Sequence, residues 1–374
     1  MTTEVTMADV IRLREVDEGD IDSLLMLEAE AFSTDRLSRR SFRHWITSAN
    51  RAFIVAEVDG ELAAYALAIY HAGTRLARLY SIATFPRFRG RGIARQLLTA
   101  AEKQASEDER FIMRLEVETD NQAAIRLYES MGYTRFGIYH DFYDNHGDAL
   151  RMQKRIHHHR RLERTIDIPW IRQTTPFTCG PAALMMAMSS IDAEYRPSVH
   201  EELQIWREAT TIFMTSGHGG CHPIGLALAA HQRGFQVEVW INTHSPLFVK
   251  GVRDAQKKQI IKLVHEDYTE QAQRAGLVIH YRDIYQQRII DAIDAGDVPL
   301  VMISTWRMDG KKAPHWVAVS GYDEDCLYLH DPDPEENNQR PLDCQYLPVA
   351  LEDFARMSLF GQQRLRTAVI IKRN

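Results

Sequence analysis

Residues 173–182 read QTTPFTCGPA, and this stretch decides the fold of the second half of the chain. Cys179 opens an apolar run that continues through residues 182–188 (AALMMAM), the pattern of a buried helix. A helix N-terminus favours the thiolate form of a cysteine that stands there. Gln173, six residues earlier, has a side chain that can donate to an oxyanion, as the backbone N–H of Cys179 can. The stretch therefore predicts a nucleophilic thiol at the start of a helix.

Two later segments contain the partners that a nucleophilic thiol needs. Residues 315–319 read HWVAV and residues 330–332 read HDP. A histidine base followed by an orienting aspartate, here His315 and Asp331, completes a triad. His330 is interpreted only as a neighbour of Asp331. A single cysteine is more often a core residue, but the agreement of all these positions favours a nucleophile.

The first half of the chain has a different signature at residues 80–94, YSIATFPRFRGRGIA. A strand there ends in glycines that open a helix, so several backbone N–H groups point at one place where a pyrophosphate can bind. Such a loop alone is weak evidence, because any tight strand–helix turn favours glycine. Glu116 and Tyr128, twelve residues apart, follow it as a candidate base and acid. Glu116 could instead be an exposed strand carboxylate, and Tyr128 a core aromatic residue.

The pattern along the chain alternates helix and strand signals in the first half. Asp20 is expected to cap a helix that reaches Phe32, and Asp59-Gly60 predicts a hairpin. We expect a domain over residues 1–155, a basic linker over 156–165 and a second domain over 166–374. The histidine tract at 157–159 is interpreted as part of a solvated linker rather than a metal site. Further elements are expected at 53–58, 62–69, 79–84, 93–105, 114–117, 121–131, 133–143, 199–208, 235–241, 298–303, 316–320, 327–329 and 368–371, with another helix after Pro223.

Composition limits the class of protein. The chain has 374 residues, enough for two domains, with 45% hydrophobic and 26% charged residues. A net charge of −6 argues against an unaided polyanion binder, so no direct nucleic-acid contact is expected. Its four cysteines have no CxxC spacing, and neither a signal peptide nor an apolar stretch of ~20 residues is evident. We expect a soluble cytoplasmic protein with reduced thiols and no membrane contact.

Residues 10–155 resemble the GCN5-related N-acetyltransferase (GNAT) superfamily, most of all its ribosomal-protein-alanine N-acetyltransferase (RimI-like) branch. The resemblance rests on Arg89, Gly92 and Ala94 of the pyrophosphate signature and on residues 115–133, LEVETDNQAAIRLYESMGY. It implies acetyl-CoA as cosubstrate, a base at the position of Glu116, and an acid for the leaving thiolate at that of Tyr128. Phe85 departs from the branch, which more often has a polar residue there. The resemblance implies acetyl-CoA contacts at Ile82, Ala83, Thr84, Arg89, Gly90, Arg91, Gly92, Ile93, Ala94, Arg95 and Asn121.

Residues 166–335 resemble the bacteriocin-leader (double-glycine) peptidase family of the papain-like clan. The match is concentrated in residues 173–182, 315–322 and 329–332, with weaker support at 220–226 and 233–235. The resemblance implies a Cys-His-Asp peptidase with a glutamine as oxyanion donor, with these roles falling to Cys179, His315, Asp331 and Gln173. Leader peptidases usually belong to a transporter, and this sequence shows no ATP-binding cassette, so cleavage coupled to export is not expected. His218, Cys221 and His222 could ligate a metal, but a loop and helix start is favoured and no metal is expected.

The sequence thus predicts an α+β protein of two domains. The first is a GNAT domain, a mixed central sheet flanked by helices. The second is a papain-like domain whose cysteine-bearing helix packs on an antiparallel sheet. The expected function is bifunctional: N-acetylation of a peptide or protein α-amine, with a ribosomal protein as one candidate, and cysteine peptidase activity. Two alternatives stay open for the second domain: binding a peptide or protein without cleavage, or using an acyl-enzyme for transfer or deamidation.

Overall fold

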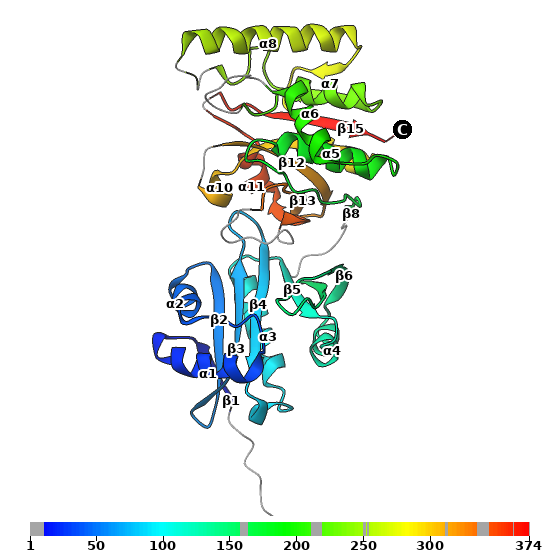
Figure 1. The fold of residues 1–374 in the computed structure, drawn as a ribbon. Helices are drawn as coiled ribbons and strands as arrows, with labels where there is room; N and C mark the ends of the chain where they lie inside the picture. Colours follow the sequence, from blue (N-terminus) through cyan, green and yellow to red (C-terminus); the bar gives the residue numbers. More distant parts are fainter. Residues whose placement is uncertain are drawn as a thin grey trace, which may run out of the picture. The chain divides into compact units, whose positions relative to one another are not determined.

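The computed structural model describes residues 11–157, 164–210, 219–249, 252, 254–310, 313–334, 344–361 and 363–373 (Figure 1). The chain divides into two compact units, Met1–His159 and Arg160–Asn374. Each unit has its own sheet.

The first unit is built on a seven-stranded sheet of order β1-β2-β3-β4-β5-β7-β6. Strands β4 and β5 are parallel, and every other neighbouring pair is antiparallel. The predicted hairpin between β2 and β3 is confirmed, since Asp59 and Gly60 have φ of 52° and 86°, as a type I′ turn requires. The strands are β1 Ile11–Glu15, β2 Arg51–Val58, β3 Glu61–Tyr70, β4 Leu76–Thr84, β5 Ile112–Glu118, β6 Thr134–Tyr139 and β7 Ala149–Arg155.

Helix α3 packs on β2, β3 and β4, and α1 packs on β3 and β4. The helices of this unit are α1 Ile21–Ala31, α2 Arg39–Thr47, α3 Ile93–Glu107 and α4 Gln122–Ser130, with 3-10 turns η1 Glu18–Asp20 and η2 Pro86–Phe88. One expectation was wrong: Asp20 precedes α1 but makes no side-chain cap. Its carboxylate instead accepts two hydrogen bonds from Arg14, both of 2.7 Å, and one from the N–H of Asp17. The carboxylate of Asp20 therefore pairs with Arg14 of β1 instead of capping α1.

The second unit has a sheet of order β10-β9-β15-β11-β12-β13-β14, with β8 paired to β12. Only β10 and β9 are parallel among the neighbouring pairs of this sheet that the structure describes. The strands are β8 Arg164–Thr165, β9 Gln236–Ile241, β10 Val278–His280, β11 Val298–Ser304, β12 Pro314–Tyr322, β13 Cys326–His330, β14 Leu347–Ala350 and β15 Thr367–Lys372.

Helix α5 packs on β12 and β11, α6 packs beside α7, and α8 packs on α7 (Figure 1). The two-domain α+β architecture, with the cysteine-bearing helix on a mainly antiparallel sheet, is therefore confirmed. The helices of this unit are α5 Cys179–Ile191, α6 Val199–Ala209, α7 Pro223–Gln232, α8 Ala255–Arg274, α9 Gln286–Ala295, α10 Trp306–Asp309 and α11 Leu351–Met357. Helices α8 and α9 were not expected from the sequence pattern.

Candidate active sites

The first candidate site lies where β4 and β5 diverge. Their parallel pairing runs from Leu76↔Ile112 to Leu79↔Leu115 and ends there, although β4 continues to Thr84 and β5 to Glu118. Opposite β3 the register of β4 shifts at the same place, so that Tyr80 is the extra residue of a bulge. A bulge bends its strand and re-aims the backbone. The divergence therefore leaves strand edges of β4 and β5 available to a ligand.

The glycine-rich loop that follows β4 forms a cradle at the start of α3. Gly90 and Gly92 have φ of 80° and 76°, a left-handed conformation that residues with side chains rarely adopt. Gly92 is the N-cap residue and provides no side-chain cap, so the first N–H groups of α3 stay available for an anion. A hollow of about 170 Å³ adjoins them. It is lined by Thr84, Phe88, Arg89, Gly90, Gly92, Ile93, Ala94, Arg95 and Leu127.

The charged residues predicted around this loop have distinct local contacts. The Nε of Arg89 donates to the carbonyl of Thr84 at 3.4 Å, and Arg95 donates to Ser130 of α4 at 2.6 Å. The guanidinium of Arg91 lies 5.3 Å from the ring centre of Phe88. Of these three cations, Arg89 and Arg95 line the hollow, and Arg91 lies over Phe88, which also lines it.

The remaining residues of the predicted acetyl-CoA set lie on β4 and at the start of α4. Ile82 is half-buried and Ala83 is buried. The side-chain oxygen of Asn121 caps α4 by accepting from the N–H of Ala124 at 3.1 Å. Phe85, where the sequence departs from the family, is 2% exposed and is a core residue. Packing therefore accounts for an aromatic side chain at that position.

Glu116 lies on β5, one residue beyond the end of the β4–β5 pairing. Its side chain is 5% exposed and accepts a 2.7 Å hydrogen bond from the Nε of Arg78, whose side chain is 8% exposed. The exposed strand carboxylate that the sequence also allowed is therefore not what the structure contains. No sequence signal pointed to Arg78, because the pair joins two strands that are 38 residues apart.

Tyr128 lies on α4 and is 5% exposed, with its ring 5.8 Å from that of Tyr133. Burial raises the pKa of Tyr128, so its phenol keeps its proton at neutral pH. Within the described part of the chain, its hydroxyl has no hydrogen-bond partner. A protonated and uncommitted hydroxyl can serve as a proton donor.

The second candidate site is a hydrogen-bonded row of a thiol, an imidazole and a carboxylate. Nε2 of His315, on β12, donates to Oδ1 of Asp331 at 2.7 Å, and the His315 ring also hydrogen bonds the thiol of Cys179. Cys179 is the first residue of α5 and is 7% exposed. Helix α5 packs on β12, which brings the two together.

The charge state of His315 follows from two opposed effects. Burial lowers the pKa of His315, but the charge of Asp331, the thiol of Cys179 and the hydrogen bonds to both outweigh it, so the pKa lies well above the ordinary value. The imidazolium form is therefore favoured at neutral pH. A protonated imidazole beside the thiol stabilises a thiolate.

Gln173 is held next to this row by its backbone. Its N–H donates to the carbonyl of Pro332 at 2.9 Å, adjacent to Asp331. The residue is 6% exposed, and its side-chain oxygen has no hydrogen-bond partner in the described part of the chain. Glu202 of α6 fixes the next residue by accepting from the N–H of Thr174 at 2.8 Å. Gln173 is thus buried and held by its backbone, and its side-chain oxygen makes no hydrogen bond within the described residues.

Cys221 and His222 contribute to packing beside the row. Cys221 lies against Gly180, and burial raises its pKa well above the ordinary value. His222 caps α7 through Nδ1, which accepts from the N–H of Ile224, and its Nε2 lies 3.0 Å from His265. Over the described ranges, no three His, Cys, Asp or Glu side chains are grouped as metal ligands would be. His218, the third residue considered for a metal, lies outside the described residues.

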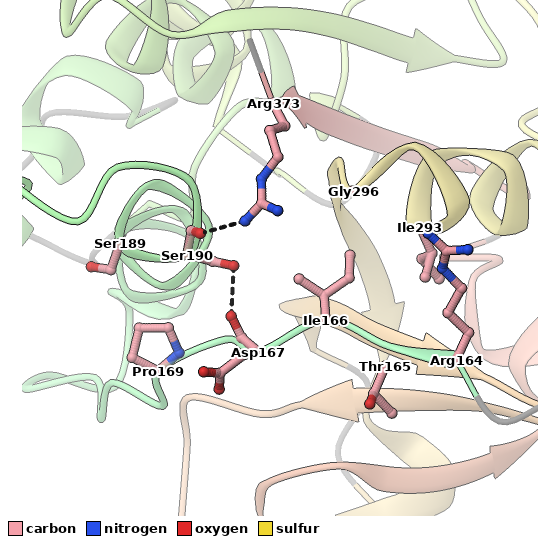
Figure 2. A pocket seen from close by; sticks show the side chains of 10 residues that line it. All are labelled: Arg164, Thr165, Ile166, Asp167, Pro169, Ser189, Ser190, Ile293, Gly296 and Arg373. Carbon is pink, nitrogen blue, oxygen red and sulfur yellow. Dashed lines mark hydrogen bonds between the residues drawn. The ribbon is translucent and has the colours of Figure 1, made fainter.

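A separate cavity of about 500 Å³ opens near the other end of α5 (Figure 2). Arg373 reaches into it and donates to the carbonyl of Ser190 at 3.1 Å, while the hydroxyl of Ser190 donates to the carbonyl of Asp167. Ser189 and Ser190, which line this cavity, are 10 and 11 residues after Cys179 on α5, so it is roughly 15–17 Å along the helix from Cys179. It is therefore distinct from the thiol site.

In the part of the chain that the structure describes, no helix combines the length and the apolar character needed to cross a membrane.

The fold and the two sites define a chain with an acetyltransferase-type unit and a papain-type thiol unit. The sequence profile of the Peptidase_C39 like family matches residues 168–372, more than half of the chain, and that of the Acetyltransferase (GNAT) family matches residues 20–133. The chain belongs to the Peptidase_C39 like family, and its first unit is a GNAT acetyltransferase domain related to RimI.

Three known proteins are similar to part of this chain. N-alpha-acetyltransferase RimI of Mycobacterium tuberculosis (strain ATCC 25618 / H37Rv) is 30% identical over 153 residues, 38% of this chain and 92% of that protein. An uncharacterized protein of Mycobacterium leprae (strain TN) is 30% identical over 140 residues, 36% of this chain, and the chain spans only 38% of its length. The crystal structure of the Escherichia coli ribosomal-protein-S18-alanine N-acetyltransferase is 23% identical, with a TM-score of 0.37, covering 41% of this chain and 97% of that one.

Proposed function

We propose that the chain is a bifunctional enzyme. Its first unit transfers acetyl from acetyl-CoA to the N-terminal α-amine of a peptide or protein, and its second unit is a cysteine peptidase. The observation that carries the second activity is the hydrogen-bonded row of Cys179, His315 and Asp331. The likeness to a protein named N-alpha-acetyltransferase RimI supports an α-amine as the acceptor. We place the domains at 1–155 and 166–374, with 156–165 as the linker.

In the acetyltransferase unit, the residues present fit a CoA cosubstrate. The N–H groups at the start of α3 and the arginines beside the hollow suit a pyrophosphate, and the free edge of β4 near Ile82 and Thr84 suits an amide-bearing chain. Acetyl-CoA supplies the thioester when it is bound. Glu116 is the carboxylate nearest the end of the paired strands, where it attracts the acceptor ammonium. Tyr128 gives its proton to the departing thiolate.

In the peptidase unit, each residue of the row has a role in the reaction. The thiolate of Cys179 attacks a peptide carbonyl, and the imidazolium of His315 then protonates the leaving amine. Water, deprotonated by His315, then hydrolyses the Cys179 thioester and regenerates the thiolate. Asp331 holds the imidazole in position through its 2.7 Å hydrogen bond. The side chain of Gln173 and the N–H of Cys179 stabilise the oxyanion. No metal takes part in this scheme.

The acetyltransferase proposal is tested with the full-length protein by calorimetry and by mass spectrometry of peptides. Acetyl-CoA at ~100 times its dissociation constant should raise the free energy of unfolding by about 2.7 kcal/mol. Peptides with free N-termini, including those of ribosomal proteins, should gain one acetyl group at the α-amine. Acetylation confined to lysine side chains would refute the α-amine assignment, and no binding of acetyl-CoA would refute the activity.

The peptidase proposal is tested by thiol alkylation and by product analysis. Cys179 should alkylate faster than Cys221, Cys326 and Cys344 below neutral pH, and His315→Ala should abolish this difference. Peptide cleavage should disappear in Cys179→Ser but persist in the matched control Cys326→Ser, which alters a buried strand thiol. Fast alkylation with deamidated or transferred products would identify a different thiol enzyme. Slow alkylation of Cys179 would identify a binding module.

A further inference from the structure

A chain of buried hydroxyl and carboxyl groups leads from the interior of the first unit to the divergence of β4 and β5. Tyr65 of β3 donates its phenolic proton to Oε1 of Glu28 on α1, and the same phenol oxygen lies 2.6 Å from the hydroxyl of Ser81 on β4. Glu28 is 2% exposed and Tyr65 is fully buried, whereas Ser81 is half-buried. The three side chains form one continuous hydrogen-bonded path with its open end at Ser81.

The middle of this path is held rigidly. The ring of Tyr65 packs edge-on against Phe42 of α2 at 6.0 Å and against Phe53 of β2 at 5.8 Å. Such packing fixes the ring and therefore the position of its hydroxyl. The second oxygen of Glu28 accepts from the N–H of Leu37, so the carboxyl group is also oriented.

The open end of the path lies at the proposed transfer site. Ser81 directly follows the bulged Tyr80, past the last β4–β5 pair. Through the register with β3, Ser81 is opposite Leu67 and Arg78 is opposite Ile69, so both point to one face of the sheet. Arg78 holds Glu116 on that same face. Ser81 and Glu116 therefore lie on the same face of the sheet, each on one of the two strands that diverge.

The carboxylates of Glu116 and Glu28 differ in their partners: Glu116 pairs with the guanidinium of Arg78, whereas Glu28 accepts from the hydroxyl of Tyr65 and the N–H of Leu37. Protonating Glu116 would break a buried ion pair with Arg78, which costs free energy. Burial raises the pKa of Glu28, although Tyr65, the N–H of Leu37 and the charge of Arg36 act in the other direction. Burial and Glu28 likewise raise the pKa of Tyr65, which therefore stays a proton donor. Glu28 therefore takes up a proton more readily than a carboxyl group with an ordinary pKa, whereas Glu116 is held in its ion pair with Arg78.

We propose that the acceptor amine loses its proton through Ser81 and Tyr65 to Glu28, while Glu116 keeps its charge and holds the ammonium in place. This rests on the proposed acetyltransferase function and assigns its proton acceptor. An ammonium N–H proton passes to the hydroxyl of Ser81, the Ser81 proton passes to Tyr65, and the Tyr65 proton passes to Glu28. The neutral amine then forms the C–N bond as the C–S bond breaks, and Tyr128 protonates the thiolate. Glu28 ends as a carboxylic acid and afterwards returns its proton to solvent.

The test compares Tyr65→Phe and Ser81→Ala with Tyr70→Phe in the full-length protein. Tyr70 is a matched control because it lies on the same strand and donates to a carboxylate, Asp108, at 2.8 Å. We expect kcat for N-terminal acetylation to fall by about 10²-fold or more in the first two variants. The dissociation constant of acetyl-CoA should be unchanged in both variants, and the control should have wild-type kcat.

The pH profile of kcat separates a relay from a merely structural role. In the wild type, kcat should fall at acid pH as Glu28 becomes protonated, and this acid limb should be absent from the residual activity of Tyr65→Phe. Thermal melting checks that the variants are folded. If Tyr65→Phe does not fold, kcat and its pH profile in Ser81→Ala test the relay instead, because Ser81 is at the half-buried end of the path.

Each outcome bears on one proposal. Wild-type kcat and an unaltered acid limb in a folded Tyr65→Phe or Ser81→Ala variant would overturn the relay while leaving the acetyltransferase function intact. A wild-type protein that binds acetyl-CoA but acetylates no N-terminal peptide would overturn the proposed function, and the relay with it.

Discussion

His315 is a buried histidine on which burial and its partners act in opposite directions. Because the partners prevail, its pKa in the folded protein lies well above the value of about 6.5 expected for the unfolded chain. Its stabilising contribution is therefore fully present below pH ~6.5 and is lost as the pH rises through the raised folded-state pKa.

This predicts a pH-dependent effect of His315→Gln. The loss in free energy of unfolding relative to the wild type should be largest near pH 6 and should shrink as the pH rises. Urea unfolding at a series of pH values measures it, with His231→Gln, on the last turn of α7, as control. A loss that grows with pH would mean that His315 is neutral in the folded protein.

Tyr128 illustrates how one hydroxyl can matter for turnover alone. We expect Tyr128→Phe to lower kcat by about 10²–10⁴-fold with little change in the dissociation constant of acetyl-CoA, because the missing proton matters only as the thiolate leaves. Tyr133→Phe, which alters the adjoining ring, is the matched control. Equal turnover in the wild type and Tyr128→Phe would assign this residue to packing.

At the scale of elements, the start of α5 depends on a residue without a side chain. A Cβ on Gly180 would lie 3.0 Å from Cβ of Cys221 and 3.2 Å from Cδ1 of Trp316. Both neighbours are buried, with exposed fractions of 2% each, so neither can move away easily. The close approach lets α5 pack against β12 and brings Cys179 to His315.

Gly180→Ala should therefore destabilise the second unit by about 1–3 kcal/mol, the usual cost of overpacking. It should also slow the alkylation of Cys179, because the helix start must shift. Gly220→Ala is the control, since a Cβ there would meet nothing within 4 Å. Thermal unfolding that is the same for both variants would show that the contact at Gly180 relaxes without cost.

The sequence predicted those elements whose signals are local. The strand before the glycine loop, the helix that begins at Cys179 and the Asp59-Gly60 hairpin are all confirmed, because turn chemistry and apolar runs mark them directly. Helix α8 was missed because its buried positions include His265 and Tyr268 within a polar sequence, so no clear apolar face is visible. A polar side chain at a core position hides the periodicity on which helix prediction depends.

The side-chain pairs of the candidate sites show the same limit. The order of Cys179, His315 and Asp331 could be read from motifs, but the ion pair of Glu116 with Arg78 and the path from Glu28 to Ser81 could not. Those contacts join residues that are far apart in sequence, on strands whose register is set by tertiary packing and, for Glu28, on helix α1. Only the folded sheet brings them together.

At the scale of the whole molecule, each candidate site draws its residues from one unit. The acetyltransferase residues fall between positions 28 and 128, and the thiol residues between 173 and 331. We therefore expect Cys179→Ser to leave N-terminal acetylation unchanged, and Tyr128→Phe to leave Cys179 alkylation unchanged. Both assays on the same two full-length variants measure this. A Cys179→Ser variant with impaired acetylation would show that the two activities are coupled.

The divergence of β4 from β5 also has a mechanical consequence. Four residue pairs join the ribbon β1–β4 to the ribbon β5–β7, and helices α1 and α3 pack on strands of the first ribbon. We therefore expect this unit to bend most easily along the boundary between β4 and β5, where few backbone hydrogen bonds resist bending. A molecule bound between the diverging edges would contact both groups of strands and would oppose their bending. The unit should therefore be most rigid when its cosubstrate is bound and more flexible once the product has left.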